Sequence, residues 1–144
     1  MRTKLQICWM LVLLGAAAAA HPARADVVVI VSAQCPLKNL TTEQLTAIYL
    51  GKVNSLPDGT RLVPVDLSED ASSRTAFYSK IIGKSANQVR SYWSRLIFSG
   101  KAQPPRAVSS EEALKKLIAE HPDWIGYIDS SALDSSVRPL KLAD

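Results

Sequence analysis

The apolar run Val27–Val31 constrains the fold of this chain most strongly. All five of its residues are β-branched and none is polar. β-Branched side chains favour extended backbone, and an apolar run without alternation is typical of a strand that is covered on both faces. Such a strand needs a layer of structure on each side, as in α/β proteins. The sequence therefore predicts an α/β domain with this segment in the middle of its sheet.

The first 25 residues have the pattern of a secretory signal peptide. Arg2 and Lys4 precede an apolar run over residues 5–20, and the sequence Ala23–Ala25 (ARA) places two small residues two positions apart, as signal peptidase requires. We expect cleavage after Ala25 and a periplasmic protein. The alternative is a retained membrane anchor, but the run is short and rich in alanine for a spanning helix.

Charge and length limit what residues 26–144 can be. Three of the seventeen basic residues belong to the signal peptide, so fourteen basic residues remain against thirteen acidic ones. A nearly neutral chain gives no support for a nucleic-acid partner. The remaining 119 residues suffice for one domain with a single core. Cys35 is the one cysteine left, so no intrachain disulfide can form, and we expect a structural thiol.

Four helices are predicted after the first strand. They cover residues 42–50, the segment from the polar loop at 70–75 to Gly83, the segment up to Gly100, and the segment that ends at Pro122. Three of them begin with a Ser or Thr followed three residues later by Gln or Glu, which predicts a capping box. These pairs are Thr41 with Gln44, Ser85 with Gln88, and Ser109 with Glu112.

Three further strands are predicted, at residues 62–65, 124–128 and 137–142. Gly126 inside the second of them marks a bulge or a close backbone approach. The two prolines at 104–105 predict a loop over residues 101–108. The order β-α-β-α-α-α-β-β predicts an α/β fold: a single small domain with a mixed, mostly parallel central sheet flanked by helices.

Ligands of open α/β sheets bind at the carboxyl ends of strands. This rule would place Ser32, Asp66 and the loop before the second helix on one edge of the sheet. The first N–H groups of a helix are unpaired and lie at the positive end of its dipole, so the hydroxyls and guanidinium at the start of this helix favour an oxyanion site. The candidate residues are Ser72, Ser73, Arg74 and Thr75, with Ser32 beside them.

Helix capping is the alternative explanation of these residues, because Ser, Thr and Asp are common at helix starts. Arg74 does not fit that explanation well. An Arg in the first helical turn opposes the dipole, so either its side chain extends away from the helix or an anion offsets its charge.

Residues 26–144 contain no recognisable catalytic or metal-binding set. His121 is their single histidine and stands at a predicted helix end, where it complements the dipole. There is no Cys/His cluster, glycine-rich phosphate loop or Ser/His/Asp set. The carboxylates, Asp66 among them, are spaced as solvated faces and helix caps. We therefore expect no metal, no cofactor and no enzyme, and we expect Tyr92, Trp93 and Trp124 to pack in the core.

Several motifs together resemble the phosphate-binding periplasmic proteins of ABC phosphate importers. The motif L-T-x-x-Q-L-x-x-I-Y-x-G-K at residues 40–52 comes first, and Trp124–Ile128 (WIGYI) comes last. Between them lie Leu62–Val65, Ser72–Phe77, Trp93–Gly100 and the two prolines at 104–105. The resemblance implies one lobe of a type II periplasmic binding protein, with phosphate or a similar oxyanion as ligand. It also implies an ABC transporter membrane component as partner, and places the family's Ser-Gly-Thr phosphate motif on residues 71–74.

The chain departs from this family in two ways. It has no glycine in the phosphate motif, and it resembles the second lobe alone of a two-lobed protein. Half a clamp would bind weakly, because the opposing donors that complete the shell of the anion are absent. The alternative is an interaction module of the cell envelope without a transport role, which has kept the fold and lost the ligand. Such a module would dock to an envelope protein or form a homodimer across the former cleft.

Overall fold

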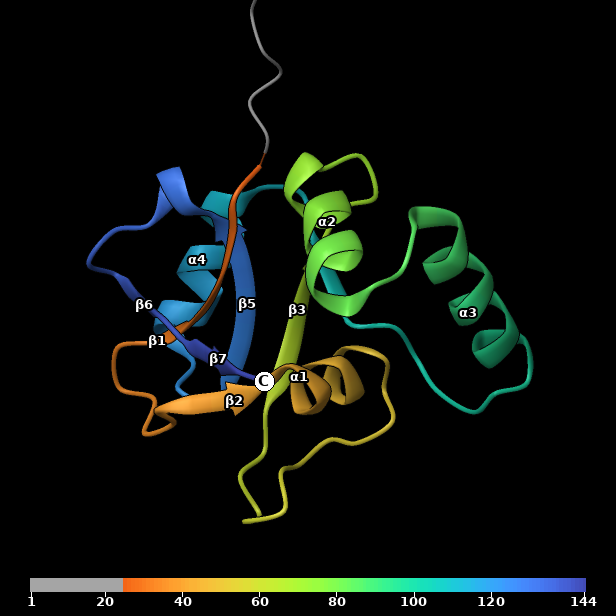
Figure 1. Ribbon diagram of the computed structural model, residues 1–144, viewed down its shortest axis with the longest axis horizontal. Helices are drawn as coiled ribbons and strands as arrows, with labels where there is room; N and C mark the ends of the chain where they lie inside the picture. Colours follow the sequence, from red (N-terminus) through yellow and green to blue (C-terminus); the bar gives the residue numbers. More distant parts are fainter. Residues whose placement is uncertain (1–24) are drawn as a thin grey trace, which may run out of the picture.

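The computed structural model describes residues 25–144 (Figure 1). The predicted signal peptide therefore lies outside the described residues, apart from Ala25. Within the described part, no helix has the length and apolar character needed to cross a membrane.

The described chain alternates short strands and helices. In chain order the elements are β1 (Val27–Ser32), β2 (Asn39–Thr41), α1 (Thr42–Tyr49), β3 (Val63–Leu67), α2 (Ser72–Phe77), a wider helical turn η1 (Tyr78–Ile82), α3 (Ala86–Phe98), β4 (Arg106–Val108), α4 (Glu111–Glu120), β5 (Trp124–Asp129), a short 3₁₀ turn η2 (Ser130–Ala132), β6 (Val137–Pro139) and β7 (Lys141–Ala143).

Five of the strands form one sheet, in the order β4-β3-β5-β1-β6. β1 lies inside this sheet and its last four residues are buried, as its apolar run predicts. It runs antiparallel to both neighbours: Val27 lies opposite Asp129 of β5, and Val31 lies opposite Arg138 of β6. β3 is parallel to β4 and β5, and β2 pairs with β7 in a separate parallel pair. The mixed α/β fold is thus confirmed.

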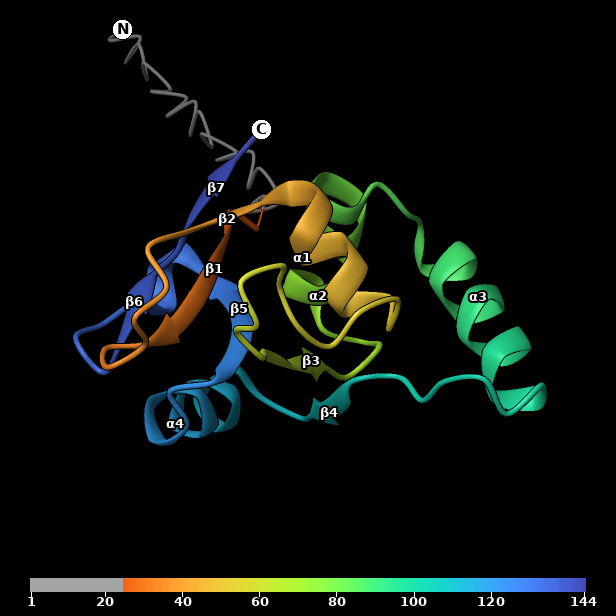
Figure 2. The same cartoon turned by 90° about the horizontal axis from the view of Figure 1, so that it is seen from below.

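Helices cover both faces of the sheet (Figure 2). Neighbouring residues of a strand point to opposite faces. In β5, a Cβ on Gly126 would meet Leu114 and Ile118 of α4, whereas the ring of Tyr127 stacks on Phe77 of α2 at a centroid distance of 3.9 Å. α4 therefore covers one face, and α2 covers the other.

The helix ends show which capping predictions hold. The capping boxes that begin with Thr41 and Ser85 are both present. The third is wrong, because the helix begins one residue later than predicted and Ser110 is its N-cap, accepting a hydrogen bond from Ala113. Gly51 and Gly83 end their helices with φ of 66° and 76°, a backbone conformation that favours glycine.

The sequence missed the shortest strands. β4 forms where residues 101–108 predict a loop, β2 was not predicted, and the predicted strand 137–142 is divided into β6 and β7 at Leu140. Each of these strands has three residues, too few to show a period. β4 pairs with β3 and β6 pairs with β1, because these strands offer unpaired backbone N–H and C=O groups. β2 and β7 pair with each other for the same reason.

The core forms one cluster. Its buried apolar side chains lie between Val29 and Leu140, on the strands and on the inner faces of the helices. Each strand and helix of the described structure also lies within residues 27–143. A chain that begins at Asp26, the predicted mature terminus, thus contains every residue of this cluster, and we expect it to fold.

Gly126→Ala tests the packing of α4 on the sheet. The new Cβ would lie 2.6 Å from Leu114 Cδ2 and 3.2 Å from Ile118 Cγ1. We expect the free energy of unfolding to fall by about 1–3 kcal/mol, as for other overpacked cores, in urea denaturation. Adding Leu114→Ala removes the closest contact, so the double variant should lose less stability than the sum of the two single variants. If the stability losses of the two single variants add up in full in the double variant, the close approach of Leu114 to residue 126 does not affect stability.

Candidate functional site

One edge of the sheet carries the candidate site. β3, β4 and β5 are parallel, so their carboxyl ends meet there, and α2 begins beside them. Asp66 lies near the end of β3 and the predicted anion-binding segment is the first turn of α2. Most of the predicted site is therefore brought together.

Ser32 does not belong to this edge, so the prediction that places it there is wrong. β1 runs antiparallel to β5, and its carboxyl end therefore lies at the opposite edge of the sheet. Ser32 is fully buried, and its hydroxyl donates to Gln34 Oε1 at 3.0 Å and to the Ala119 carbonyl at 3.3 Å. The rule on carboxyl ends applies to parallel strands, which is why it failed for β1.

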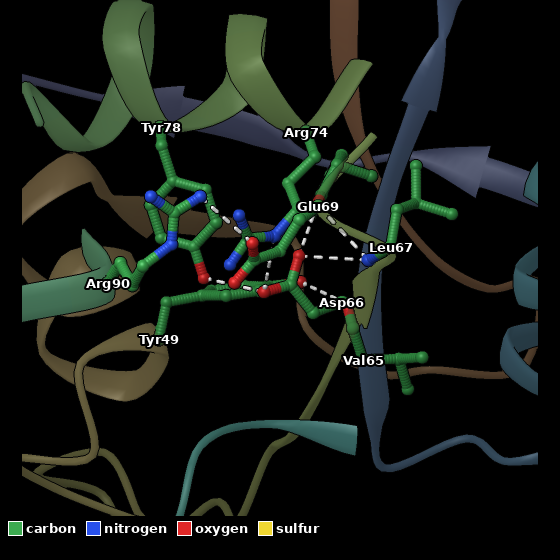
Figure 3. Close-up of polar contacts among 9 residues, drawn as sticks. Tyr49, Val65, Asp66, Leu67, Glu69, Arg74, Tyr78 and Arg90 are labelled. Atoms are coloured by element: carbon green, nitrogen blue, oxygen red, sulfur yellow. Dashed lines mark hydrogen bonds and ion pairs between the residues drawn. The ribbon is translucent and has the colours of Figure 1, made fainter. Parts of the chain in front are cut away.

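The carboxylate of Asp66 is the centre of the site (Figure 3). Asp66 is only 4% exposed, although the spacing of the carboxylates in the sequence predicts that it is solvated. Oδ2 accepts hydrogen bonds from Tyr78 Oη at 2.8 Å and Arg74 Nε at 3.3 Å. Oδ1 accepts one from Leu67 N at 2.8 Å and another from the hydroxyl of Tyr127. Such a buried charge is tolerated only when it is paired and hydrogen-bonded, as here.

Tyr78 and Tyr127 are functional candidates that the sequence analysis did not identify. Both are buried, and burial, followed by the negative charge of Asp66, raises the pKa of each hydroxyl far above its usual value. They therefore stay protonated and act as donors to the carboxylate. The available signal was an aspartate inside an otherwise apolar strand, which needs buried donors from other elements.

Arg74 extends away from the helix axis onto Asp66. Its side chain is 12% exposed, and the guanidinium carbon lies 4.9 Å from the centroid of the Tyr78 ring. The sequence suggests that either this side chain extends away from the helix or an anion offsets its charge. The structure shows an extended side chain whose charge has an internal partner, Asp66. Only Nε contacts Asp66, and among the described residues the two terminal nitrogens of Arg74 form no hydrogen bond.

The other three residues of the first turn of α2 differ in exposure. Ser73 is buried and its hydroxyl donates to Glu111, which also accepts from Asp129 N at 2.9 Å. Ser72 and Thr75 are exposed. The N-cap, Ala71, has no side chain that could cap the helix. Within the described chain, the backbone N–H groups of Ser72 and Ser73 have no protein acceptor.

The remaining candidates occupy structural positions. Trp93 and Cys35 are buried, and Tyr92 donates a hydrogen bond to the Leu50 carbonyl at 2.6 Å. His121 is the C-cap of α4, as expected, and stacks on Trp124 at 4.0 Å. Among residues 25–144, no three His, Cys, Asp or Glu side chains lie close enough to hold a metal.

Solved structures share this fold. An ABC-type phosphate transport receptor from Vibrio cholerae matches with a TM-score of 0.64 and 22% identity, over 83% of this chain and 48% of the receptor. A protein from Clostridium perfringens, described as a phosphate ABC transporter substrate-binding protein with bound phosphate, matches with a TM-score of 0.64 and 24% identity, over 82% of this chain and 45% of its own. PstS from Borrelia burgdorferi matches at 0.60 with 16% identity, over 83% and 48% of the two chains.

These matches confirm the fold that the sequence motifs predict, a lobe like those of phosphate ABC transporter substrate-binding proteins. The chain spans about half the length of the proteins it matches. No protein-family model matches the sequence.

Asp66→Asn should destabilise the protein strongly. The amide keeps the shape of the side chain but leaves the guanidinium of Arg74, which is only 12% exposed, without a counter-charge. Breaking a buried pair in this way costs about 3–5 kcal/mol, measured as the free energy of unfolding in urea. The double variant with Arg74→Gln has no unpaired charge and should recover part of the loss. If it is no more stable than Asp66→Asn, the ion pair is not what holds this edge.

Stability should fall at alkaline pH. The unfolded chain releases the protons of Tyr78 and Tyr127 near the ordinary pKa of 10.0, whereas the folded chain keeps them because their pKa values are raised. The folded state then binds more protons than the unfolded state, so the free energy of unfolding decreases as pH rises above 10. In urea unfolding at a series of pH values, Tyr78→Phe should make this decrease less steep. An equally steep decrease in that variant would contradict the assignment.

Proposed function

We propose that this chain is an exported binding protein for phosphate or a similar oxyanion, with its site at the first turn of α2. The observation that carries the proposal is the shared fold with phosphate-binding proteins, together with the uncapped N–H groups of Ser72 and Ser73 at that turn. Unpaired N–H groups at a helix start favour an anion through direct donation and through the dipole.

The proposed contacts come from four consecutive residues. The exposed hydroxyls of Ser72 and Thr75 donate from the surface, and Ser73 contributes its backbone N–H. Arg74 contributes its terminal nitrogens while Nε stays on Asp66. An Arg that is already oriented loses less conformational freedom when it binds an anion with two parallel hydrogen bonds.

The site is expected to bind weakly. Asp66 offsets the charge of Arg74, and Glu111 lies beside the same turn, on Ser73. The chain also spans about half the length of the proteins whose fold it shares. We propose that a second binding partner in the periplasm, such as an ABC transporter membrane component or another copy of this chain, supplies the donors that complete the anion shell. No catalytic step is part of this function.

The pairing of Arg74 with Asp66 favours a second candidate, a protein-interaction module of the cell envelope that has lost its ligand. In this case the carboxylate of Asp66 stays paired with the guanidinium of Arg74, which is then not available to an anion. The two candidates differ in whether a folded, pure protein binds an anion at all.

Calorimetric titration of residues 26–144 with phosphate, and separately with sulfate, at low ionic strength tests the proposal. We expect saturable binding that Ser72→Ala combined with Thr75→Val weakens at least about a hundredfold, because hydrogen bonds to a charged group contribute about 1.5–3 kcal/mol each. Arg74→Lys keeps the charge but not the planar donor pair, and should also weaken binding.

Ser135→Ala is the matched control, since this serine is exposed and lies on the connection before β6. It should bind as the unmodified protein does. Absence of binding by a folded sample would reject the anion site and favour the interaction module. Binding that persists unchanged in both site variants would place the anion elsewhere on the molecule.

A further inference from the structure

Helix α3 projects from one end of the molecule and leaves its outer side uncovered (Figures 1 and 2). Its apolar spacing predicts a wide buried stripe, but only Val89 and Trp93 are fully buried. Ile97 follows Val89 by eight positions and so falls on the same stripe, but it is 46% exposed, and Phe98 is 96% exposed. Phe98 follows Val89 by nine positions, which is half a turn beyond two full turns, so it stands on the side opposite the buried one.

Basic residues surround this exposed ring. The segment from residue 71 to residue 110 has no acidic residue, although the described chain as a whole is nearly neutral. Within this segment, only Arg74 and Arg90 form ion pairs with other described residues, and both pair with the β3 side of the molecule at Asp66 and Glu69. The basic residues of the segment are Arg74, Lys80, Lys84, Arg90, Arg95, Lys101 and Arg106.

Three of these side chains lie together on the outer side of α3. Lys84, Arg90 and Arg95 line one open hollow with amide and hydroxyl side chains, and no acidic residue lines it. Arg95 and Lys101 are exposed on either side of Phe98 in the sequence. The outer side of α3 therefore combines several cationic groups with one apolar ring at its carboxyl end.

From these observations we infer that the outer side of α3 docks on an anionic lipid bilayer, with the ring of Phe98 inserted between the headgroups. Exposed Lys and Arg side chains near an anionic bilayer contribute about 1 kcal/mol each, and an aromatic ring is stable at the interface between headgroups and acyl chains. A lipid bilayer is a fluid surface, so binding to it depends on charge complementarity and on the one apolar anchor, Phe98.

Other occupants match this surface less well. A second copy docked by the same face would bring two sets of basic groups together, and like charges repel. Among the described residues, Lys84, Arg95 and Lys101 of each set have no ion-pair partner. A stable protein interface buries about 800 Å² on each partner around a packed apolar centre. Phe98 and Ile97 are flanked by polar and basic residues, and the hollow on this side of α3 is lined mainly by polar and basic side chains rather than by a packed apolar centre.

Co-sedimentation with vesicles tests the inference on residues 26–144, which lack the predicted signal peptide. We expect the protein to bind vesicles of equimolar phosphatidylcholine and phosphatidylglycerol, not to bind phosphatidylcholine alone, and to be released by high salt. Phe98→Ala should weaken binding about tenfold, given the apolar area of the ring. Because Phe98 is almost fully exposed, this variant should melt at the same temperature as the unmodified protein.

Charge reversal supplies the matched comparison. Arg95→Glu with Lys101→Glu should weaken binding at least about a hundredfold, since each reversal replaces attraction by repulsion. Lys116→Glu with Lys141→Glu makes the same change in net charge at exposed positions on α4 and β7, and should weaken binding far less.

Three results would overturn the inference. One is absence of binding to the anionic vesicles at low salt, and another is an equal loss in the two double variants. The third is a dimer in sedimentation velocity that Phe98→Ala dissociates, which would assign the face to a second copy of the chain.

Discussion

The carboxylate of Asp66 holds together the sheet edge at which β3, β5 and α2 meet. Its donors come from three different elements: Arg74 from α2, Tyr78 from η1 and Tyr127 from β5. A charge buried in this way is costly by itself, and it becomes tolerable only when all of these donors are in place. The network therefore fixes the position of the first turn of α2 relative to the sheet, which is the geometry that any anion site at this edge depends on.

The same network limits what the edge can bind. An external anion would have to share Arg74 with the carboxylate of Asp66, so its affinity would come mainly from the N–H groups and hydroxyls of the turn. Under the proposed function, this edge would therefore be a weak anion site rather than a strong one. The basic outer side of α3 lies on a different element, which is joined to this edge through the ion pair of Arg90 with Glu69.

Sequence patterns predicted those elements of the fold that contain an apolar run or a helix cap long enough to recognise. The β-branched run of β1, the capping boxes at Thr41 and Ser85 and the close approach at Gly126 all appear in the structure as expected. Strand direction has no local signal, because it depends on which strands become neighbours, so Ser32 was placed at the wrong edge. The burial of Asp66 was missed for a similar reason: its donors Tyr78 and Tyr127 are 12 and 61 residues away along the chain.

The position of β1 has a consequence for the order in which the molecule can assemble. β1 is the first strand of the described chain, yet its two neighbours in the sheet, β5 and β6, come from its last part. Contacts so distant in sequence form slowly, because a long loop must close before they contribute stability. During synthesis β1 thus stays without its two sheet neighbours until residues 124–139 have left the ribosome. That delay leaves an interval in which the chain is still unfolded, the state that a polypeptide needs if it is to be threaded across a membrane.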